Sequence, residues 1–120
     1  MAANNQGFIA LSTLVSQLSH LRDVLDPDMT ALAMAIFVEV AAHPADEGVP
    51  MSRIVDKFKM SASTASRNIY LLSSGFVRPG QPRKGLGVIR TDTSPVDRRS
   101  LQVYLTPRGQ AIIKGLLQVK

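Results

Sequence analysis

The chain has 120 residues, of which 45% are hydrophobic, so it is long and apolar enough for one folded domain. It contains no cysteine, which excludes disulfides, thiolate metal sites and thiol redox chemistry and fits the reducing cytoplasm in which we expect the protein to work. The net charge is +5. No apolar run approaches the ~20 residues of a membrane span, and we expect no membrane contact.

The charge is unevenly distributed along the chain. Residues 1–50 carry one basic side chain and six acids, a net −5, whereas residues 51–120 carry thirteen basic side chains and three acids, a net +10. A strongly basic half is suited to a polyanion such as nucleic acid. A solvated basic face is the alternative that charge alone leaves open.

Hydrophobic spacing predicts two helices in the acidic half. Residues 1–7 are expected to form a flexible tail, and residues 8–120 a single domain. Residues 8–25 carry an uninterrupted apolar stripe at steps of three and four residues, which predicts a helix. Asp26 and Pro27 are typical of a helix start, so a second helix is expected from there to about Ala42.

The basic half predicts a helix–turn–helix, a hairpin and a last helix. Helices are expected over residues 52–59 and 63–74, after a possible short strand at 49–50. Residues 76–85 are rich in proline and glycine and are expected to be a loop. Alternation predicts strands at 86–92 and 100–105 around a tip at 93–99, and Thr106-Pro107 begins the last helix. The expected class is mainly α with a β-hairpin wing, in the order α-α-α-α-β-β-α of a winged helix-turn-helix.

The second helix of the helix–turn–helix pair is the candidate DNA reader. Its N-terminal half would enter the major groove, where small residues allow close approach. Arg67 lies on one face with Ser63 and Thr64 and is suited to bidentate contact with guanine. The hydroxyl groups can hold phosphate oxygens, although ordinary helix capping by Ser61 is the alternative. Asn68 can read adenine but lies nearer the buried side.

The predicted hairpin is a candidate second contact with DNA. Arg98 and Arg99 at its tip can reach the minor groove, where a narrow A·T-rich groove attracts arginine. Asp97 is expected to pair with an arginine and fix its direction. Arg90 on the preceding strand is a candidate backbone contact. A solvated hairpin tip is the alternative.

Residues 29–113 resemble the MarR family of bacterial winged-helix regulators. The resemblance is carried by Ser61-Ala62-Ser63-Thr64-Ala65-Ser66-Arg67, Asp97-Arg98-Arg99-Ser100 and Val103-Tyr104-Leu105-Thr106-Pro107-Arg108-Gly109. It implies symmetric dimers that bind pseudo-palindromic operators and usually repress. It also implies that Ser63, Thr64 and Arg67 read the major groove, and that Arg99, braced by Asp97, enters the minor groove.

The chain departs from the family pattern in three places. Lys59 stands where the turn usually has glycine. The segment 78–85 is longer than usual, and its Arg83 and Lys84 are candidate phosphate contacts, with a plain solvated loop as the alternative. The sequence stops at Lys120, before the further helix that builds most of the family's dimer interface. We therefore expect residues 8–25 and 107–119 to form a homodimer interface instead. Packing of the stripe of residues 8–25 inside the monomer is the alternative.

The sequence predicts a dimeric, sequence-specific regulator of bacterial or phage origin that represses by occupying an operator on double-stranded DNA. Two alternatives remain: a phage or plasmid winged-helix factor for replication or genome organisation, and a winged-helix protein-interaction module. An enzyme is not expected, because His20 and His43 lie near no matching base or nucleophile. We expect no cofactor and no metal. The sequence marks no effector site.

Overall fold

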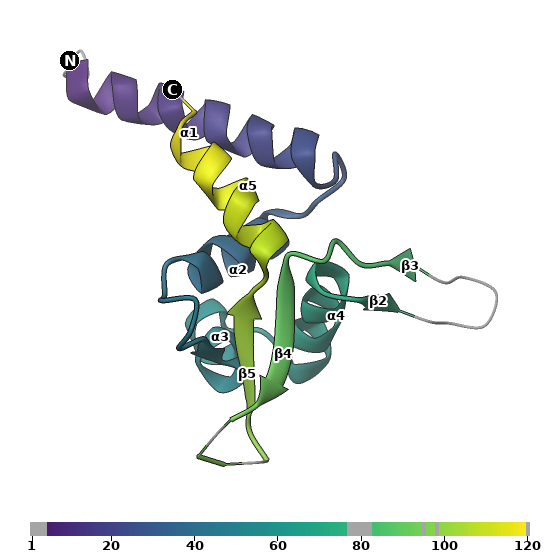
Figure 1. Cartoon of the computed structure of the whole chain (residues 1–120). Coiled ribbons are helices and arrows are strands. Elements are labelled where there is room, and N and C mark those ends of the chain that lie inside the picture. The colour runs from purple at the N-terminus through teal and green to yellow at the C-terminus, as the bar shows by residue number, and fades with distance from the viewer. Residues whose placement is uncertain (1–4, 77–82, 95, 98, 120) are drawn as a thin grey trace.

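The computed structural model describes residues 5–76, 83–94, 96–97 and 99–119. Within them the expected winged-helix order is confirmed, with two small additions in strand content (Figure 1). The elements are α1 (Asn5–Val24), α2 (Ala31–Ala41), β1 (Val49–Pro50), α3 (Met51–Phe58), α4 (Ala62–Leu72), β2 (Gly75–Phe76), β3 (Arg83–Lys84), β4 (Ile89–Thr93), β5 (Leu101–Leu105) and α5 (Pro107–Leu117).

Three helices begin at a hydroxyl side chain that caps a backbone N–H group. Thr30 Oγ1 accepts from the Ala33 N–H (3.1 Å), and Ser61 Oγ accepts from the Thr64 N–H (3.1 Å). Thr106 caps α5 in the same way, and Pro107 follows in its first turn. The expected start of the second helix at Asp26 is wrong. Asp26 Oδ1 instead accepts from the Asp28 N–H (2.9 Å), an Asx turn that delays α2 to Ala31.

A three-stranded antiparallel sheet forms the wing and its base. Its order is β1-β5-β4, with Val49 opposite Val103 and Ile89 opposite Leu105. The short strand considered at 49–50 is therefore present. Since β4 and β5 pair from Ile89 to Thr93, the hairpin extends well beyond the helical core (Figure 1).

One hydrophobic core holds the helix–turn–helix against the sheet. Its central side chain is Phe37 of α2, which is completely buried. Other side chains of the same cluster, each at most 3% exposed, come from α2, β1, α3, α4, β5 and the residue before β4: Ile36, Val49, Ile54, Ile69, Leu72, Val88 and Val103. Burial of these residues fixes α3 and α4 relative to the wing.

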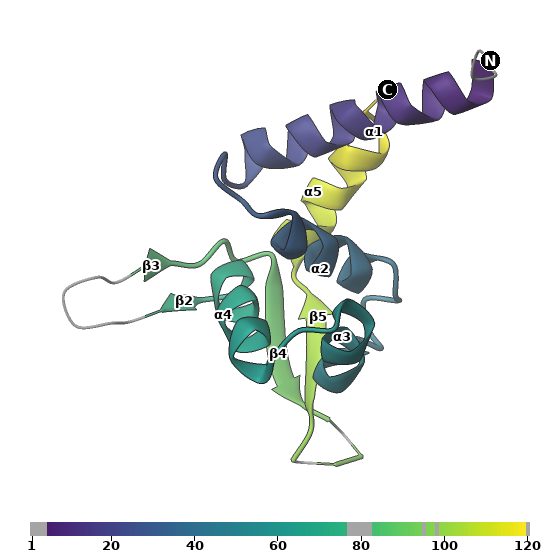
Figure 2. The same ribbon diagram turned by 180° about the vertical axis from the view of Figure 1, so that it is seen from behind.

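The helix α1 begins at Asn5, earlier than expected, and keeps most of its apolar stripe outside the core. Leu21 is 2% exposed, but large side chains earlier in the helix are 42–67% exposed: Phe8, Ile9, Leu11, Leu14, Val15 and Leu18. Figures 1 and 2 both show the N-terminal part of α1 extending beyond α5 and the rest of the molecule. The stripe therefore does not serve to fold the single chain.

Two of the places where the sequence departs from the MarR pattern affect the path of the chain, namely the segment 76–85 and Lys59. The expected loop 76–85 is wrong at its ends, because β2 and β3 form a two-stranded ladder in which Gly75 lies opposite Lys84. Two-residue strands are too short to show alternation in a sequence. Lys59 ends α3 in the left-handed conformation (φ 51°, ψ 48°), so a side chain occupies the position that glycine favours.

Candidate nucleic-acid interface

The helix α4 presents a polar face opposite its buried one. Ala65, Ile69 and Leu72 are buried, whereas Ser63 and Arg67 are exposed. Because these two are four residues apart, they lie on the same outward side of the helix, one turn from each other. The structure thus brings Ser63 and Arg67 together as the sequence predicts.

The hydroxyl groups at the start of α4 form a local network. Ser61 Oγ accepts from the Thr64 N–H, donates to Thr64 Oγ1 (3.0 Å) and lies 3.2 Å from Ser63 Oγ. Capping therefore does take place. Ser61 and Ser63 are exposed and Thr64 is half-buried, so the first two remain accessible to a phosphate oxygen.

Asn68 lies on the flank of α4 rather than on its outward face. It is half-buried, and its Nδ2 donates to the carbonyl oxygen of Thr64 (2.9 Å), one turn earlier in the same helix. A bidentate contact with adenine needs that amide group. The geometry therefore favours Arg67 over Asn68 as the base-reading side chain.

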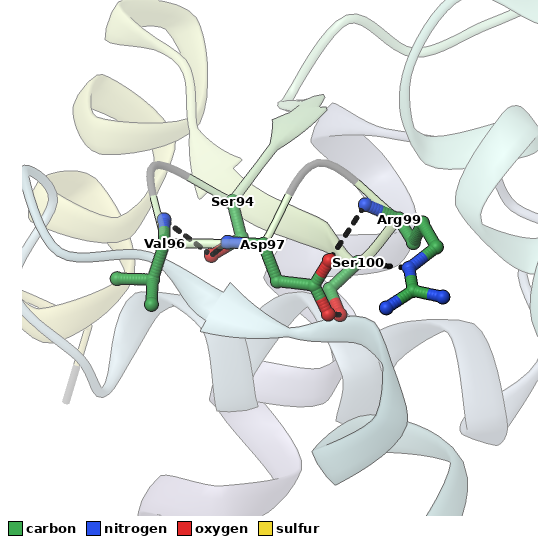
Figure 3. Close-up of polar contacts among 5 residues, drawn as sticks. All are labelled: Ser94, Val96, Asp97, Arg99 and Ser100. Atoms are coloured by element: carbon green, nitrogen blue, oxygen red, sulfur yellow. Dashed lines mark hydrogen bonds and ion pairs between the residues drawn. The ribbon is translucent and has the colours of Figure 1, made fainter.

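The wing tip is organised around Asp97. Its Oδ1 accepts from the Arg99 N–H (3.0 Å) and lies 3.7 Å from Arg99 Nε, and Ser100 Oγ donates to Oδ2 (3.2 Å). Ser94 Oγ receives the N–H groups of Val96 and Asp97 on the other side of the turn (Figure 3). The expected pair between Asp97 and an arginine is thus present.

Arg99 is the basic residue of the wing tip that lies within the described part of the chain. Its side chain is 95% exposed, so it is held at its backbone and extends into solvent. The exposed ion pair with Asp97 is worth only ~0–1 kcal/mol, so its role is orientation. Arg98 lies outside the described residues.

Arg90 is held on the face of the wing opposite to the one that Ile89 buries. It lies directly across from Tyr104, with its guanidinium carbon 4.3 Å from the centre of that ring. Its Nη1 lies 3.8 Å from Asp92 Oδ2. Sequence reasoning missed this stacking, although the pairing register would have shown it. Arg83 and Lys84 belong to β3, where Lys84 is exposed; the side chain of Arg83 lies outside the described part.

An ion-pair cluster joins α2 to α3. Glu39 of α2 pairs with Lys57 of α3, and His43 Nε2 lies 3.1 Å from Glu39 Oε1. The Glu39 side chain is 12% exposed. Hydrogen bonding from Lys57 first, and then from His43, lowers the pKa of the Glu39 carboxyl. The cluster orients the first helix of the helix–turn–helix.

The wing tip and the exposed apolar stripe of α1 lie at opposite ends of the molecule. Both ribbon views place α1 and the end of α5 at one end and the wing tip at the opposite end (Figures 1 and 2).

Among the described residues, no group of His, Asp and Glu side chains is arranged to hold a metal ion. None of the described helices meets the length and apolarity needed to cross a membrane.

No family model and no curated protein matches the sequence. Solved structures do match. A MarR crystal structure shares 20% identity at a TM-score of 0.61, over 98% of this chain and 75% of that one. The regulator Tm0710 of Thermotoga maritima gives a TM-score of 0.70 at 16% identity, over 95% and 68% of the two chains. The Staphylococcus aureus MepR–DNA complex gives 0.68 at 14%, over 98% and 82%. The chain has the winged-helix fold of MarR-type regulators.

Proposed function

We propose that the protein is a non-enzymatic transcription regulator that binds a specific duplex DNA sequence as a homodimer and represses by occupying the operator. The observation that carries the proposal is the outward face of α4, where exposed Arg67 follows Ser63 by one helical turn. An arginine there has the reach and the donors to recognise guanine in the major groove. The likeness to a fold solved in complex with DNA supports this reading.

The wing supports a second contact with the same duplex. Arg99 extends from a turn that the Asp97 carboxylate stabilises, because Oδ1 accepts from the Arg99 N–H and Oδ2 accepts from Ser100 Oγ. We infer that Arg99 enters the minor groove next to the major groove that α4 reads. Ser61, Ser63, Thr64, Lys84 and the stacked Arg90 would contact phosphates, as would Arg83 and Arg98.

The opposite end of the molecule supports the dimer. The apolar stripe of α1 is exposed in the single chain, and a second copy is the partner that would cover it symmetrically. From α5 only Leu117, at 73%, is an exposed large apolar side chain, because Leu116 is buried and Ile112 and Ile113 pack against the core. The proposed interface therefore rests mainly on α1.

Selection from random duplexes at ~150 mM salt tests the proposal. A dimeric operator-binding protein should enrich a pseudo-palindrome with half-sites about one helical turn apart. Arg67→Ala should then relax the preference at one position of each half-site, with a cost of ~1–3 kcal/mol. Arg67→Lys, which keeps the charge but lacks the planar pair of donors, is the matched control.

The other outcomes separate the remaining functions. Binding without any enriched sequence would contradict sequence-specific regulation and indicate a replication or architectural factor. Absence of duplex binding would leave a protein-interaction module, with the basic face turned to an acidic partner. In either case the operator mechanism would be rejected.

A further inference from the structure

Three neighbouring hollows follow the wing, the first against the start of α3 and the other two against α4 and its end. We call this row of hollows the groove. Met51 and Leu101 line both the first and the second, and Ser74 and Thr91 line both the second and the third. The hollows therefore adjoin one another from the base of the wing tip to the end of α4.

The middle of this groove is uncharged. Its cavity of about 90 Å³ is lined by Met51, Ser66, Ile69, Tyr70, Ser73, Ser74, Thr91 and Leu101. Tyr70 is 52% exposed and Leu101 is 44% exposed, so a large part of both apolar walls faces solvent. The rim carries exposed hydroxyl groups, those of Ser66 and Ser74 on one side and Thr91 on the other.

The groove carries a cationic group in each of its outer hollows. Arg99 and Ser100 line the first hollow together with Leu101, and Arg90 lines the third together with Thr91. Tyr70 of the middle hollow follows Arg67 by three residues and therefore shares the outward side of α4 with it. An uncharged, partly apolar hollow between two arginines is suited to a polyanion whose own surface is partly apolar.

The sugar–phosphate strand of DNA has that surface, because apolar deoxyribose rings alternate with charged phosphates. When a recognition helix occupies the major groove and a wing occupies the adjacent minor groove, the strand that separates the two grooves passes between helix and wing. We propose that this strand lies in the groove between α4 and the wing, with deoxyribose packed against Tyr70 and Leu101. This inference rests on the proposed function.

The side chains that line the middle hollow make a specific demand on the DNA contact. Burial of an apolar side chain releases no counterions, so Tyr70 contributes affinity that does not depend on salt.

Titration of a selected duplex and of an unrelated duplex of equal length tests the proposal, at several salt concentrations. Tyr70→Ala is expected to weaken binding to both duplexes about tenfold, with the same slope of log K against log salt as the parent protein. Tyr70→Phe keeps the ring and should stay within about threefold. Leu101→Ala, on the opposite wall, should repeat the effect of Tyr70→Ala.

Val38→Ala is the matched control, since Val38 is a 42% exposed apolar residue of α2 outside the groove. Thermal melting verifies that each variant is folded. Unchanged affinity of Tyr70→Ala would overturn the proposal, and so would a loss confined to one sequence, which would make Tyr70 a base reader. A reduced salt slope would assign it to a phosphate. If the parent protein binds no duplex, the proposed function fails first, before the groove is tested.

Discussion

Gly109 of α5 lies so close to Val88 that a Cβ atom there would be 2.2 Å from the Val88 carbonyl oxygen. The same carbonyl accepts the N–H of Thr106 (3.0 Å), and Thr106 Oγ1 donates to the Gly87 carbonyl (2.7 Å). Arg108 Nε donates to the Leu86 carbonyl (3.0 Å). The start of α5 is therefore joined to the segment that leads into the wing.

Replacing Gly109 by alanine should destabilise the fold, because a backbone carbonyl cannot move away without breaking these bonds. We expect a loss of about 3 kcal/mol in the free energy of unfolding, measured with urea. Gly115→Ala is the internal control. Its Cβ would meet only His20 Nε2 at 3.7 Å, so helix propensity should give a gain of ~0.5–1 kcal/mol. Equal effects at the two glycines would contradict the close approach at Gly109.

These contacts explain why the sequence predicts the start of α5 correctly. The Leu-Thr-Pro-Arg-Gly motif at 105–109 predicts a helix start, and each of Thr106, Arg108 and Gly109 has a structural requirement there. The motif is therefore a specific signature because the fold requires these residue types at these positions. The outward polar face of α4 was predictable for a different reason, since helical spacing alone places Ser63 and Arg67 on one side.

Other features depend on contacts between distant segments and were not predictable. The apolar spacing of α1 predicts a helix correctly, but it cannot tell whether the stripe meets its own core or another chain. The start of α2 was misplaced because Asp26 forms a local turn with Asp28 instead of a helix cap. The stacking of Arg90 on Tyr104 and the groove beside Tyr70 both need the register of β4 and β5.

The wing tip offers a test in which charge and geometry predict opposite signs. Asp97→Ala removes a negative charge from the tip that we propose to contact DNA, which by charge alone should strengthen binding. Because Asp97 holds the backbone of Arg99, we expect binding to weaken instead, by about three- to tenfold, as measured by duplex titration. Asp97→Asn keeps an acceptor for the Arg99 N–H and should lose less. Asp56→Ala, an exposed acid on α3, is the control for charge. Tighter binding by Asp97→Ala would show that the aspartate only repels DNA.

The Glu39 cluster predicts a pH dependence of stability. Lys57, and to a smaller extent His43, lower the pKa of Glu39 in the folded chain below its value in the unfolded chain. The ionised group therefore stabilises the fold above the ordinary carboxyl range, near 4.3, and this contribution is lost as the pH falls through the folded pKa. Glu39→Gln should cost ~1 kcal/mol at pH 7 and progressively less toward pH 3, measured by urea unfolding across that range. Asp46→Asn, at an exposed acid, should show no such convergence. A constant difference between parent and Glu39→Gln at all pH values would remove the ion pair as the cause.

The exposed stripe of α1 gives the last prediction, on assembly. Leu14 is 48% exposed, so glutamate at this position should leave the folded chain intact, while a buried, unpaired carboxylate would be costly in an interface between two copies. Sedimentation should therefore give twice the 13.0 kDa chain mass for the parent protein and a single mass for Leu14→Glu. Ala31→Glu adds the same charge at an exposed position in the first turn of α2 and should remain dimeric. The monomeric variant should still bind one half-site but lose the affinity that comes from engaging two at once. A parent protein that is monomeric at micromolar concentration, or a Leu14→Glu variant that still dimerises, would exclude α1 as the interface and leave its stripe for a different partner.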